Sequence, residues 1–361
     1  MENLIPRKSA SLIISKINPN PSSLYNYKLL LFKRSKNGSF PNVYAFPGGN
    51  YSDKYDNLEI PKDEFPLKNL INTAHRELLE ECGLFFSQLK SDDWNILNEI
   101  KKDFLSKNKH WDEFNYLKSS LNKDFDEIYP FIRLITIPYL KYRYDTQFFF
   151  YQIKKNSAVN WKQFFNADMS FDSTFQTFDQ INFDRKEFDE MIWLDPSEIL
   201  YKFYTSKDFR LAPPQFLIIN ILSSFLDFRS LIAYLNTRKT KKFQVDPFTF
   251  PNMFYLTNTE KVSPFNTPKN YPYLTLSAGD WEYPIETIAN NEKDEMLKKE
   301  IIKKSEILKG GKNEQKNRIY FEDLSKLFEC KFETEIKLNS LNPFNFLKSY
   351  EEIQNFIKFK K

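Results

Sequence analysis

The stretch "AHRELLEECGL" (74–84) gathers three carboxylates on one side of a predicted helix. Glu77, Glu80 and Glu81 stand at spacings of i, i+3 and i+4, so they share one face. Like charges at these spacings destabilise a helix by about 0.2–0.5 kcal/mol per pair, and Arg76 is the only nearby cation in the sequence to offset them. A solvated acidic face is the common explanation of such a pattern. The alternative is that the carboxylates bind a cation.

The helix that carries these glutamates is predicted to run from about Leu67 to Cys82, and Gly83 is well placed to end it. Its apolar face has helical spacing: Leu67, Leu70, Ile71, Ala74, Leu78 and Cys82. Three apolar runs that precede the helix are predicted strands, at 9–16, 27–35 and 43–49. Between the last run and the helix lies a polar segment with two prolines, residues 50–66, which we interpret as a surface insertion.

The rest of the chain adds strands and helices in a mixed order. Residues 91–128 are predicted to be a charged helical insertion. Two strands are expected at 131–140 and 144–153, and a change from strand to helix at 195–197. Residues 213–236 are predicted to be helical, with a break near Asp227.

This order predicts an α/β (α+β) fold, a mixed β-sheet with helices on its faces. We expect one domain over residues 1–240 and a C-terminal extension over 241–361 that packs on it. The periodic pattern weakens in the extension, where a charged helix is predicted within 291–318.

Composition excludes several classes of protein. The 361 residues are 41% hydrophobic and 28% charged, which is typical of a globular chain. A formal charge of +4, without a basic cluster, argues against a nucleic-acid partner. Two cysteines and two histidines are too few for a disulfide framework or a His-based zinc site, so a reducing, intracellular compartment is expected. No apolar run is long enough for a membrane span, and no secretory signal is expected.

Taken together, "FPGG" (46–49) and "RELLEECGL" (76–84) resemble the box of the Nudix hydrolase superfamily. The consensus is Gly-x5-Glu-x7-Arg-Glu-U-x-Glu-Glu-x-Gly-U, where U is aliphatic. Its places are filled here by Gly49, Arg76, Glu77, Leu78, Glu80, Glu81, Gly83 and Leu84. Gly49 and Arg76 stand 27 positions apart instead of 14, however, and Tyr55 and Lys68 occupy the places where spacing would put the first glutamate. The sequence therefore offers no counterpart for that residue.

A box split by an insertion resembles the branch that includes the peroxisomal coenzyme A diphosphatases. The similar segments appear in order from Ser9 to Pro284: "RSKNGSFPNVYAFPGG", "TIPYLKYRYDTQFFF", "EFDEMIWLDPSEIL", "LAPPQFLIINIL" and "LTLSAGDWEYP". The resemblance implies a Nudix-type sheet sandwiched between helices. The branch suggests peroxisomes, but the C-terminus "FIKFKK" is not of the Ser-Lys-Leu type, so a mitochondrial or cytoplasmic location is equally expected.

The resemblance implies a hydrolase that cleaves a nucleoside diphosphate linked to another moiety, with coenzyme A or an acyl-CoA as the leading substrate. Nucleotide sugars, ADP-ribose and capped RNA remain open. Glu77, Glu80 and Glu81 would bind Mg²⁺ or Mn²⁺, and Arg76 would hold a box carboxylate in place. The backbone at Gly48 and Gly49 would approach the diphosphate, as glycine allows.

Other residues are candidates for catalysis or phosphate binding. The general base is either a box glutamate or one of Glu187 and Glu190, for which ordinary loop charge is the alternative. Arg34, Arg133 and Arg143 are candidates to bind phosphates. An ion pair with Asp145 would explain Arg143 without substrate. His75 is expected to be an exposed polar helix residue.

A function of another class stays open. The missing first glutamate and the additional segments 91–128 and 285–361 are also compatible with a Nudix domain that serves as a structural or regulatory subunit of a larger assembly, for which a mitochondrial location stays open. In that case these segments would contact protein partners, and the three glutamates would be inert. A bound metal at the glutamates would distinguish the enzyme from the subunit.

Overall fold

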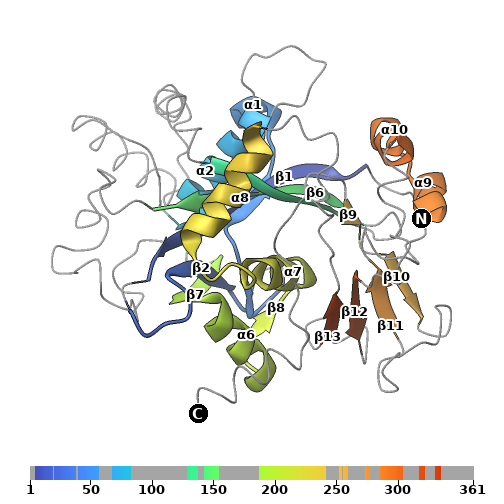
Figure 1. Cartoon of the computed structure of the whole chain (residues 1–361). Coiled ribbons are helices and arrows are strands. Elements are labelled where there is room, and N and C mark those ends of the chain that lie inside the picture. The colour runs from blue at the N-terminus through green and yellow to red at the C-terminus, as the bar shows by residue number, and fades with distance from the viewer. Residues whose placement is uncertain are drawn as a thin grey trace, which may run out of the picture.

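In a computed structural model, the chain forms a large mixed sheet, a smaller antiparallel sheet and helices around them (Figure 1). The structure describes residues 5–18, 20–37, 40–56, 67–82, 128–136, 142–153, 187–240, 252–253, 255–258, 273–276, 285–303, 317–321 and 330–334. The predicted helical insertion at 91–128 lies outside these residues, except for Ile128, which begins a strand instead. The predicted mixed α/β architecture is confirmed.

The large sheet has the strand order β8-β3-β2-β1-β6-β5-β9, and β4 and β7 also pair with its inner strands. The strands in chain order are β1 (Arg7–Ile17), β2 (Tyr27–Arg34), β3 (Val43–Ala45), β4 (Gly48–Asn50), β5 (Ile128–Ile135), β6 (Tyr144–Gln152), β7 (Phe188–Leu194), β8 (Arg210–Leu211) and β9 (Asn252–Met253). Strand β1 is central, since it is parallel to β6 and antiparallel to β2 and β4. A central strand is covered on both faces, which explains why its residues from Ser9 to Lys16 are all buried, with the apolar Leu12, Ile13 and Ile14 at their middle.

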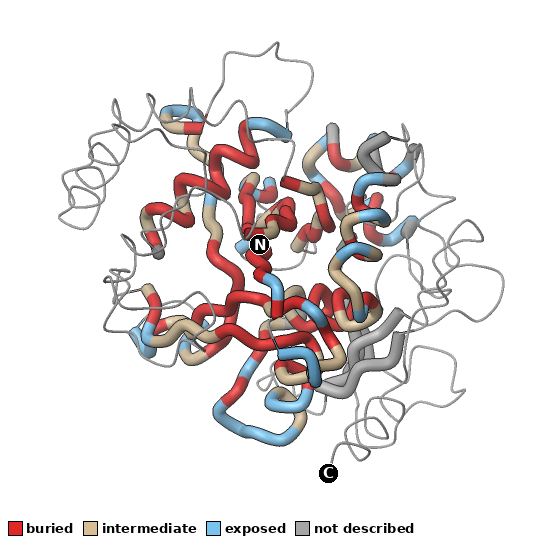
Figure 2. The backbone as a smooth tube through the Cα atoms, turned by 60° about the vertical axis from the view of Figure 1, so that its left-hand side comes forward, coloured by how far each residue is buried: buried red, intermediate tan, exposed pale blue. Residues whose placement is uncertain are grey.

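Helices cover both faces of this sheet. Helix α2 (Leu67–Cys82) packs on one face, where alternate residues of β1 such as Leu12 and Ile14 meet its residues Ala74 and Leu78. The other face is covered by α6 (Pro196–Thr205), α7 (Pro213–Leu222) and α8 (Phe228–Thr240). Figure 2 shows that the buried residues lie along these strands and on the helices, whereas the exposed ones concentrate in the connecting turns.

Local signals in the sequence set the helix boundaries as predicted. Asp195 caps α6: its carboxylate accepts from the backbone N–H of Glu198, and the Glu198 side chain accepts from the backbone N–H of Asp195. Pro196 occupies the first turn, where a missing N–H costs nothing. The helical stretch 213–236 is broken between α7 and α8, next to Asp227, as expected.

The C-terminal extension contains more regular structure than its sequence suggested. A second sheet has the order β10-β11-β12-β13, with strands β10 (Tyr255–Asn258), β11 (Tyr273–Leu276), β12 (Asn317–Phe321) and β13 (Cys330–Thr334). Two helices, α9 (Ile285–Asn291) and α10 (Glu295–Lys303), lie between β11 and β12 in the chain. The charged helix that was predicted within 291–318 is confirmed by α10, and its predicted end near Gly310 lies outside the described residues.

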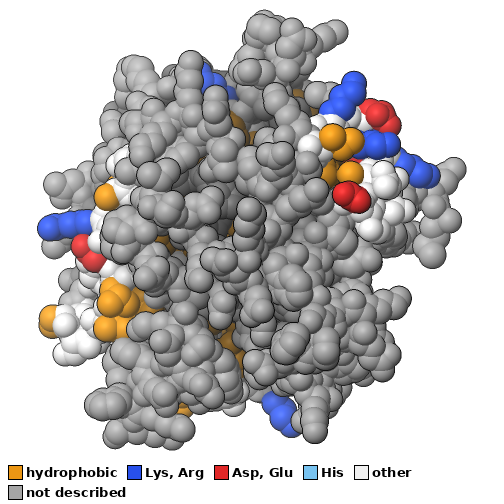
Figure 3. Space-filling model, turned by 45° about the vertical axis from the view of Figure 1, so that its right-hand side comes forward, with side chains coloured by type: hydrophobic (Ala, Val, Ile, Leu, Met, Phe, Trp, Pro, Cys, Tyr) orange, Lys and Arg blue, Asp and Glu red, His pale blue; other side chains and the backbone are white. Residues whose placement is uncertain are grey.

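The exposed side chains of α9 and α10 have mixed charges, among them Glu286, Lys293, Glu295 and Lys299. Figure 3 shows acidic and basic side chains next to one another on the described part of that face. Among the described residues, none of the helices has the length and apolar character that a membrane crossing requires.

The segment 50–66 is not simply a surface insertion. Its first residues end β4 and then form a short helix, α1 (Asp53–Asp56), while 57–66 lie outside the described residues. Helix α1 contacts α2, and Asp56 is completely buried between them. A buried carboxylate needs a partner, and the partner of Asp56 is Arg76 on α2.

Candidate functional site

The carboxylates of α2 lie against the backbone of β4. The backbone N–H of Gly48 donates to Glu81 Oε2 at 2.9 Å. A Cβ atom at Gly49 would collide with the carboxylate of Glu77. The glycines thus let the backbone approach two glutamates, which is a use that the sequence did not suggest. Gly48 is required for a second reason, because a Cβ there would also collide with the backbone of Ala10 and Ser11 on β1.

Arg76 connects α2 to the short helix before it. Its Nε donates to Asp56 Oδ1 at 2.9 Å and its Nη2 donates to Asp56 Oδ2 at 2.9 Å, so the pair is bidentate. Nη2 also donates to the carbonyl oxygen of Asn50 at 2.6 Å. Thr73 donates its hydroxyl to the same carboxylate. These contacts fix the guanidinium and hold β4, α1 and α2 together.

Asp56 is the site residue that the sequence did not reveal. The expected position of the first box glutamate, six residues after Gly49, is occupied by Tyr55, and the acid that binds Arg76 is the next residue. A search for any acid close to the expected position would have included Asp56 as a candidate. The sequence spacing could not show that Asp56 binds Arg76, because that contact depends on how α1 packs against α2.

Arg76 also holds two box glutamates. Its Nη1 lies 2.8 Å from Glu77 Oε1 and 3.3 Å from Glu80 Oε1. The structure thus places Arg76 against two carboxylates of the box. One guanidinium therefore serves three carboxylates, those of Asp56, Glu77 and Glu80.

Burial makes ionisation of the glutamates unfavourable. Burial raises the pKa of Glu77 to about 7, against the opposing effect of Arg76, and the neighbouring charge of Glu80 raises it further. Burial, followed by repulsion from Glu77, raises the pKa of Glu81 well above its usual value, although the N–H of Gly48 and the charge of Arg34 act the other way. The cations near these two glutamates therefore do not fully offset the cost of ionising them.

Arg34 and Glu187 lie at the edge of this site. Both groups act on the ionisation of Glu81, Arg34 by lowering its pKa and Glu187 by raising it. They also pair with each other, with Arg34 Nη2 at 3.4 Å from Glu187 Oε2. The guanidinium carbon lies 5.8 Å from the centre of the Phe188 ring. The structure therefore brings these two predicted residues together with the glutamates.

Glu190 is held elsewhere. Its Oε2 accepts a hydrogen bond from the Tyr44 hydroxyl at 2.8 Å, and Lys33 Nζ lies 3.9 Å away. Tyr44 belongs to the core cluster that packs under α6, α7 and α8, whereas α2 packs in the other cluster. The two candidate acids thus differ: the charge of Glu187 raises the pKa of Glu81, whereas Glu190 contacts a residue of the opposite layer.

Arg143 is also placed away from the glutamates. Its Nη1 and Nη2 donate to the two carboxylate oxygens of Glu292 at 3.0 and 2.6 Å, and both side chains are fully buried. The expectation that Arg143 binds phosphate, or else pairs with Asp145, does not describe this contact. Asp145 instead accepts from Arg133 and Lys8, so Arg133 is engaged there too.

His75 differs from its expectation. It was expected to be exposed, but only 1% of its surface is accessible, because the preceding and following turns of α2 pack against the sheet. Burial lowers the pKa of His75 to about 4, so the imidazole is neutral at physiological pH.

A divalent cation fits the chemistry of this site. Hard cations such as Mg²⁺ and Mn²⁺ prefer oxygen ligands, which Glu77, Glu80 and Glu81 supply. Positive charge would also offset the burial and the repulsion that raise the pKa values of Glu77 and Glu81. In the described parts of the chain, however, no three His, Cys, Asp or Glu side chains are already grouped as metal ligands.

Comparisons with known proteins give matches among solved structures. No protein-family model matches the chain, and no curated protein does so either. Among solved structures, it is similar to a NUDIX hydrolase from Alicyclobacillus acidocaldarius at 18% identity and a TM-score of 0.41, over 63% of this chain and 96% of that one. It is also similar to a MutT/nudix family protein from Enterococcus faecalis (14% identity, TM-score 0.26, 54% of this chain and 45% of that one). A third is the NUDIX domain of Shewanella oneidensis NrtR in complex with ADP ribose (9% identity, TM-score 0.28, 55% and 78%).

Proposed function

We propose that the protein is a metal-dependent hydrolase of the Nudix type that cleaves a nucleoside diphosphate linked to another moiety. Coenzyme A and acyl-CoA are the substrates that we propose first, on the sequence resemblance. One observation carries the proposal: the buried carboxylates of Glu77 and Glu81 lie one helical turn apart against Gly48–Gly49, with Arg76 bound to Asp56 behind them. This arrangement accumulates negative charge where a diphosphate and its cation would meet.

In this proposal Glu77, Glu80 and Glu81 hold Mg²⁺ or Mn²⁺. When bound, the cation supplies Lewis-acid polarisation of the phosphoryl oxygens. Arg76 orients Glu77 and Glu80, and Asp56 holds Arg76 in turn. Fixed carboxylates matter because catalysis depends on ligand geometry to within fractions of an ångström.

Arg34 and Glu187 complete the proposed machinery. Arg34 is the cation that we assign to a phosphate of the substrate, since a guanidinium suits phosphate oxygens and this one lies at the edge of the glutamate site. Glu187 accepts the proton of the attacking water, as its side chain is 45% exposed and is paired only loosely with Arg34 at 3.4 Å. Arg34 would shift from Glu187 to the phosphate when substrate binds.

The overall reaction adds one water across a phosphoanhydride. The water oxygen bonds to one phosphorus, the bridging P–O bond breaks, and the bridging oxygen leaves with the other phosphate. For coenzyme A, the products are 3′,5′-ADP and 4′-phosphopantetheine.

A second function is favoured by a specific observation. Glu77 and Glu80 are already ion-paired with Arg76, and Glu81 already accepts the Gly48 N–H, so the chain satisfies its own carboxylates. The same domain would then act as a structural or regulatory subunit, without hydrolysis.

A substrate panel separates the two functions. The purified chain is incubated with Mg²⁺ or Mn²⁺ and coenzyme A, acyl-CoA, ADP-ribose or capped RNA, and the products are identified by mass spectrometry. The double variant Glu80→Gln/Glu81→Gln is the control for the site, and Glu295→Gln, an exposed change on α10, is the control for substitution itself. Hydrolysis by the wild type and Glu295→Gln but not by the double variant supports the enzyme. Folded wild-type protein that cleaves none of the panel favours the subunit.

A further inference from the structure

We propose that cation binding at the glutamates of α2 is coupled to the docking of helix α1, with Asp56 as the positioning residue that links the two. This coupling rests on the proposed function, because it presupposes that Glu77 and Glu80 bind a divalent cation. It adds a role for α1, whose residues are not among the proposed ligands. The link is the guanidinium of Arg76, which α1 and the glutamates share.

The guanidinium of Arg76 makes its two sets of contacts through different nitrogen atoms. Nε and Nη2 donate to the two carboxylate oxygens of Asp56, both at 2.9 Å. Nη1 instead lies 2.8 Å from Glu77 Oε1 and 3.3 Å from Glu80 Oε1. The contacts of Nη1 can therefore be broken while the bidentate pair with Asp56 stays intact.

The two sets of contacts also differ in their access to solvent. Asp56 and Arg76 are buried, whereas the side chains of Glu77 and Glu80 are 15% and 18% exposed. A cation from solution therefore meets the two glutamates rather than Asp56. When Glu77 and Glu80 bind it, Nη1 gives up both ion pairs, and repulsion between the like charges drives the guanidinium toward Asp56.

Helix α1 depends on the carboxylate of Asp56 for its position. The helix has four residues, which are too few to be stable as a helix on their own. Asp56 Oδ2 accepts from the backbone N–H of Ser52 at 2.9 Å and from the hydroxyl of Thr73 on α2 at 3.0 Å. A guanidinium that binds Asp56 more tightly therefore holds α1 more firmly on α2.

The coupling must act in both directions, because the effect of one binding event on another is reciprocal. In Asp56→Asn, release of the guanidinium from Glu77 and Glu80 would leave a buried positive charge near the cation, without the carboxylate of Asp56 to offset it. This variant should therefore bind a cation more weakly, although Asp56 is not a proposed ligand.

Hydrogen exchange of the full chain tests the coupling without turnover. The N–H groups of Tyr55 and Asp56 donate to the carbonyl oxygen of Ser52, so their exchange reports on α1. We would follow peptides that cover residues 50–56 by mass spectrometry, with and without Mn²⁺, and use α6 on the other face of the sheet as the internal reference. Electron paramagnetic resonance would give the Mn²⁺ affinity of the wild type and Asp56→Asn. Asp53→Asn is the matched control, because it removes the same charge from an exposed position of the same helix.

We expect Mn²⁺ to slow the exchange of residues 50–56 in the wild type and to leave that of α6 unchanged. Asp56→Asn should bind Mn²⁺ about 10- to 100-fold more weakly, as is typical when a residue behind a metal ligand is changed, and Asp53→Asn should bind it like the wild type. The exchange of the wild type decides the question even if Asp56→Asn does not fold.

Two results would overturn the coupling and leave the cation site in place. One is unchanged exchange of residues 50–56 in wild-type protein that has bound Mn²⁺, and the other is wild-type affinity in folded Asp56→Asn. Wild-type protein that binds no Mn²⁺ would reject the cation site of the proposed function, and the coupling with it. Protection of residues 50–56 by Mn²⁺ in a chain that hydrolyses nothing would leave the coupling standing and reject the hydrolase.

Discussion

At the scale of single residues, the site is governed by carboxylates that the fold makes costly to ionise. Glu81 is buried and accepts from the Gly48 N–H, Glu77 is half-buried beside Gly49, and Arg76 is shared among three acids. A strongly raised carboxylate pKa in a cluster of acids is a common feature of functional sites. It also has a direct consequence for stability.

The stability of the metal-free protein should depend on the protonation of Glu77. Its pKa is raised from 4.5 to about 7 in the folded chain, so the folded state binds more protons than the unfolded state between these values. The resulting stabilisation is complete below about pH 4.5 and is lost as the pH rises to about 7. The loss is limited to about 3 kcal/mol, because one pKa unit corresponds to about 1.4 kcal/mol.

The measurement is urea unfolding of the wild type and Glu77→Gln from pH 5 to 8 in a chelator. We expect the wild type to lose stability relative to the variant as the pH rises. The opposite contribution of His75, whose pKa is lowered to about 4, cancels because both proteins contain it. Parallel stability profiles would show that Glu77 ionises normally.

Two acids, Glu187 just before β7 and Glu190 within it, allow a sharp test of the general base. Glu187 acts on Glu81, whereas Glu190 accepts from Tyr44 in the opposite layer. We therefore expect Glu187→Gln to lower kcat by about 10²- to 10⁴-fold and Glu190→Gln to leave kcat nearly unchanged. Steady-state hydrolysis of the best substrate measures both. An equal effect of the two changes would reject the assignment of Glu187.

At the scale of secondary-structure elements, the sequence predicted those helix boundaries that depend on a local pattern of residues. Helix α2 has the predicted bounds, since its apolar spacing is regular, and the start of α6 follows its Asp195–Pro196 signal. The pairing of α1 with α2 could not be read in this way. It depends on a contact between Asp56 and Arg76, 20 positions apart, and on a chain path that no local preference encodes.

Asp56 should be essential for the position of α2. Asp56→Asn leaves the guanidinium of Arg76 buried without its bidentate partner, so we expect a loss of about 3–5 kcal/mol in the free energy of unfolding. Asp53→Asn, an exposed change on the same short helix, should cost less than about 0.5 kcal/mol. Chemical denaturation of both variants measures these changes in the free energy of unfolding. Similar small losses for the two would mean that Asp56 does not fix Arg76.

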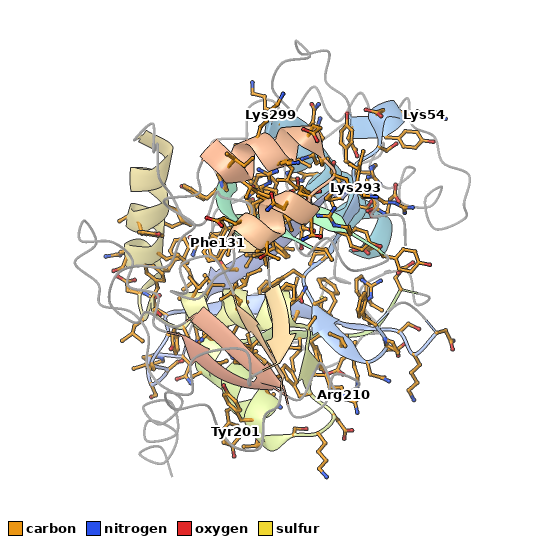
Figure 4. The ribbon with its side chains drawn as sticks, turned by 90° about the vertical axis from the view of Figure 1, so that its right-hand side faces the viewer. Lys54, Phe131, Tyr201, Arg210, Lys293 and Lys299 are labelled. Atoms are coloured by element: carbon orange, nitrogen blue, oxygen red, sulfur yellow. The ribbon has the colours of Figure 1, made fainter. Side chains whose placement is uncertain are left out.

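At the scale of the whole molecule, a buried ion pair links helices of the C-terminal extension to the large sheet, with which strand β9 of the extension also pairs. Arg143 precedes β6, and Glu292 lies between α9 and α10, 149 positions later. Figure 4 shows the two helices side by side, with Lys299 of α10 and Lys293 of the connection between them labelled. The sequence suggested that the extension packs on the domain, but not by which residues, because a pairing over this distance leaves no local pattern.

Removal of that pair should loosen the extension. Glu292→Gln leaves the Arg143 charge fully buried, so we expect a loss of about 3–5 kcal/mol and faster cleavage of residues 285–303 in limited proteolysis. Glu295→Gln, on the exposed part of α10, serves as the matched control. Unchanged proteolysis of Glu292→Gln would show that other contacts hold α9 and α10 in place.

The central claim is that the glutamates of α2 bind a divalent cation, and a Mn²⁺ titration followed by electron paramagnetic resonance tests it most directly. The account predicts that the wild type and Glu190→Gln remove free Mn²⁺ from solution at pH 8, and that Glu80→Gln/Glu81→Gln binds it at least about tenfold more weakly. Wild-type protein that binds no Mn²⁺, or a double variant that binds it equally well, would contradict the account. The acidic face of α2 would then be a structural feature, and the subunit function would take the place of the hydrolase.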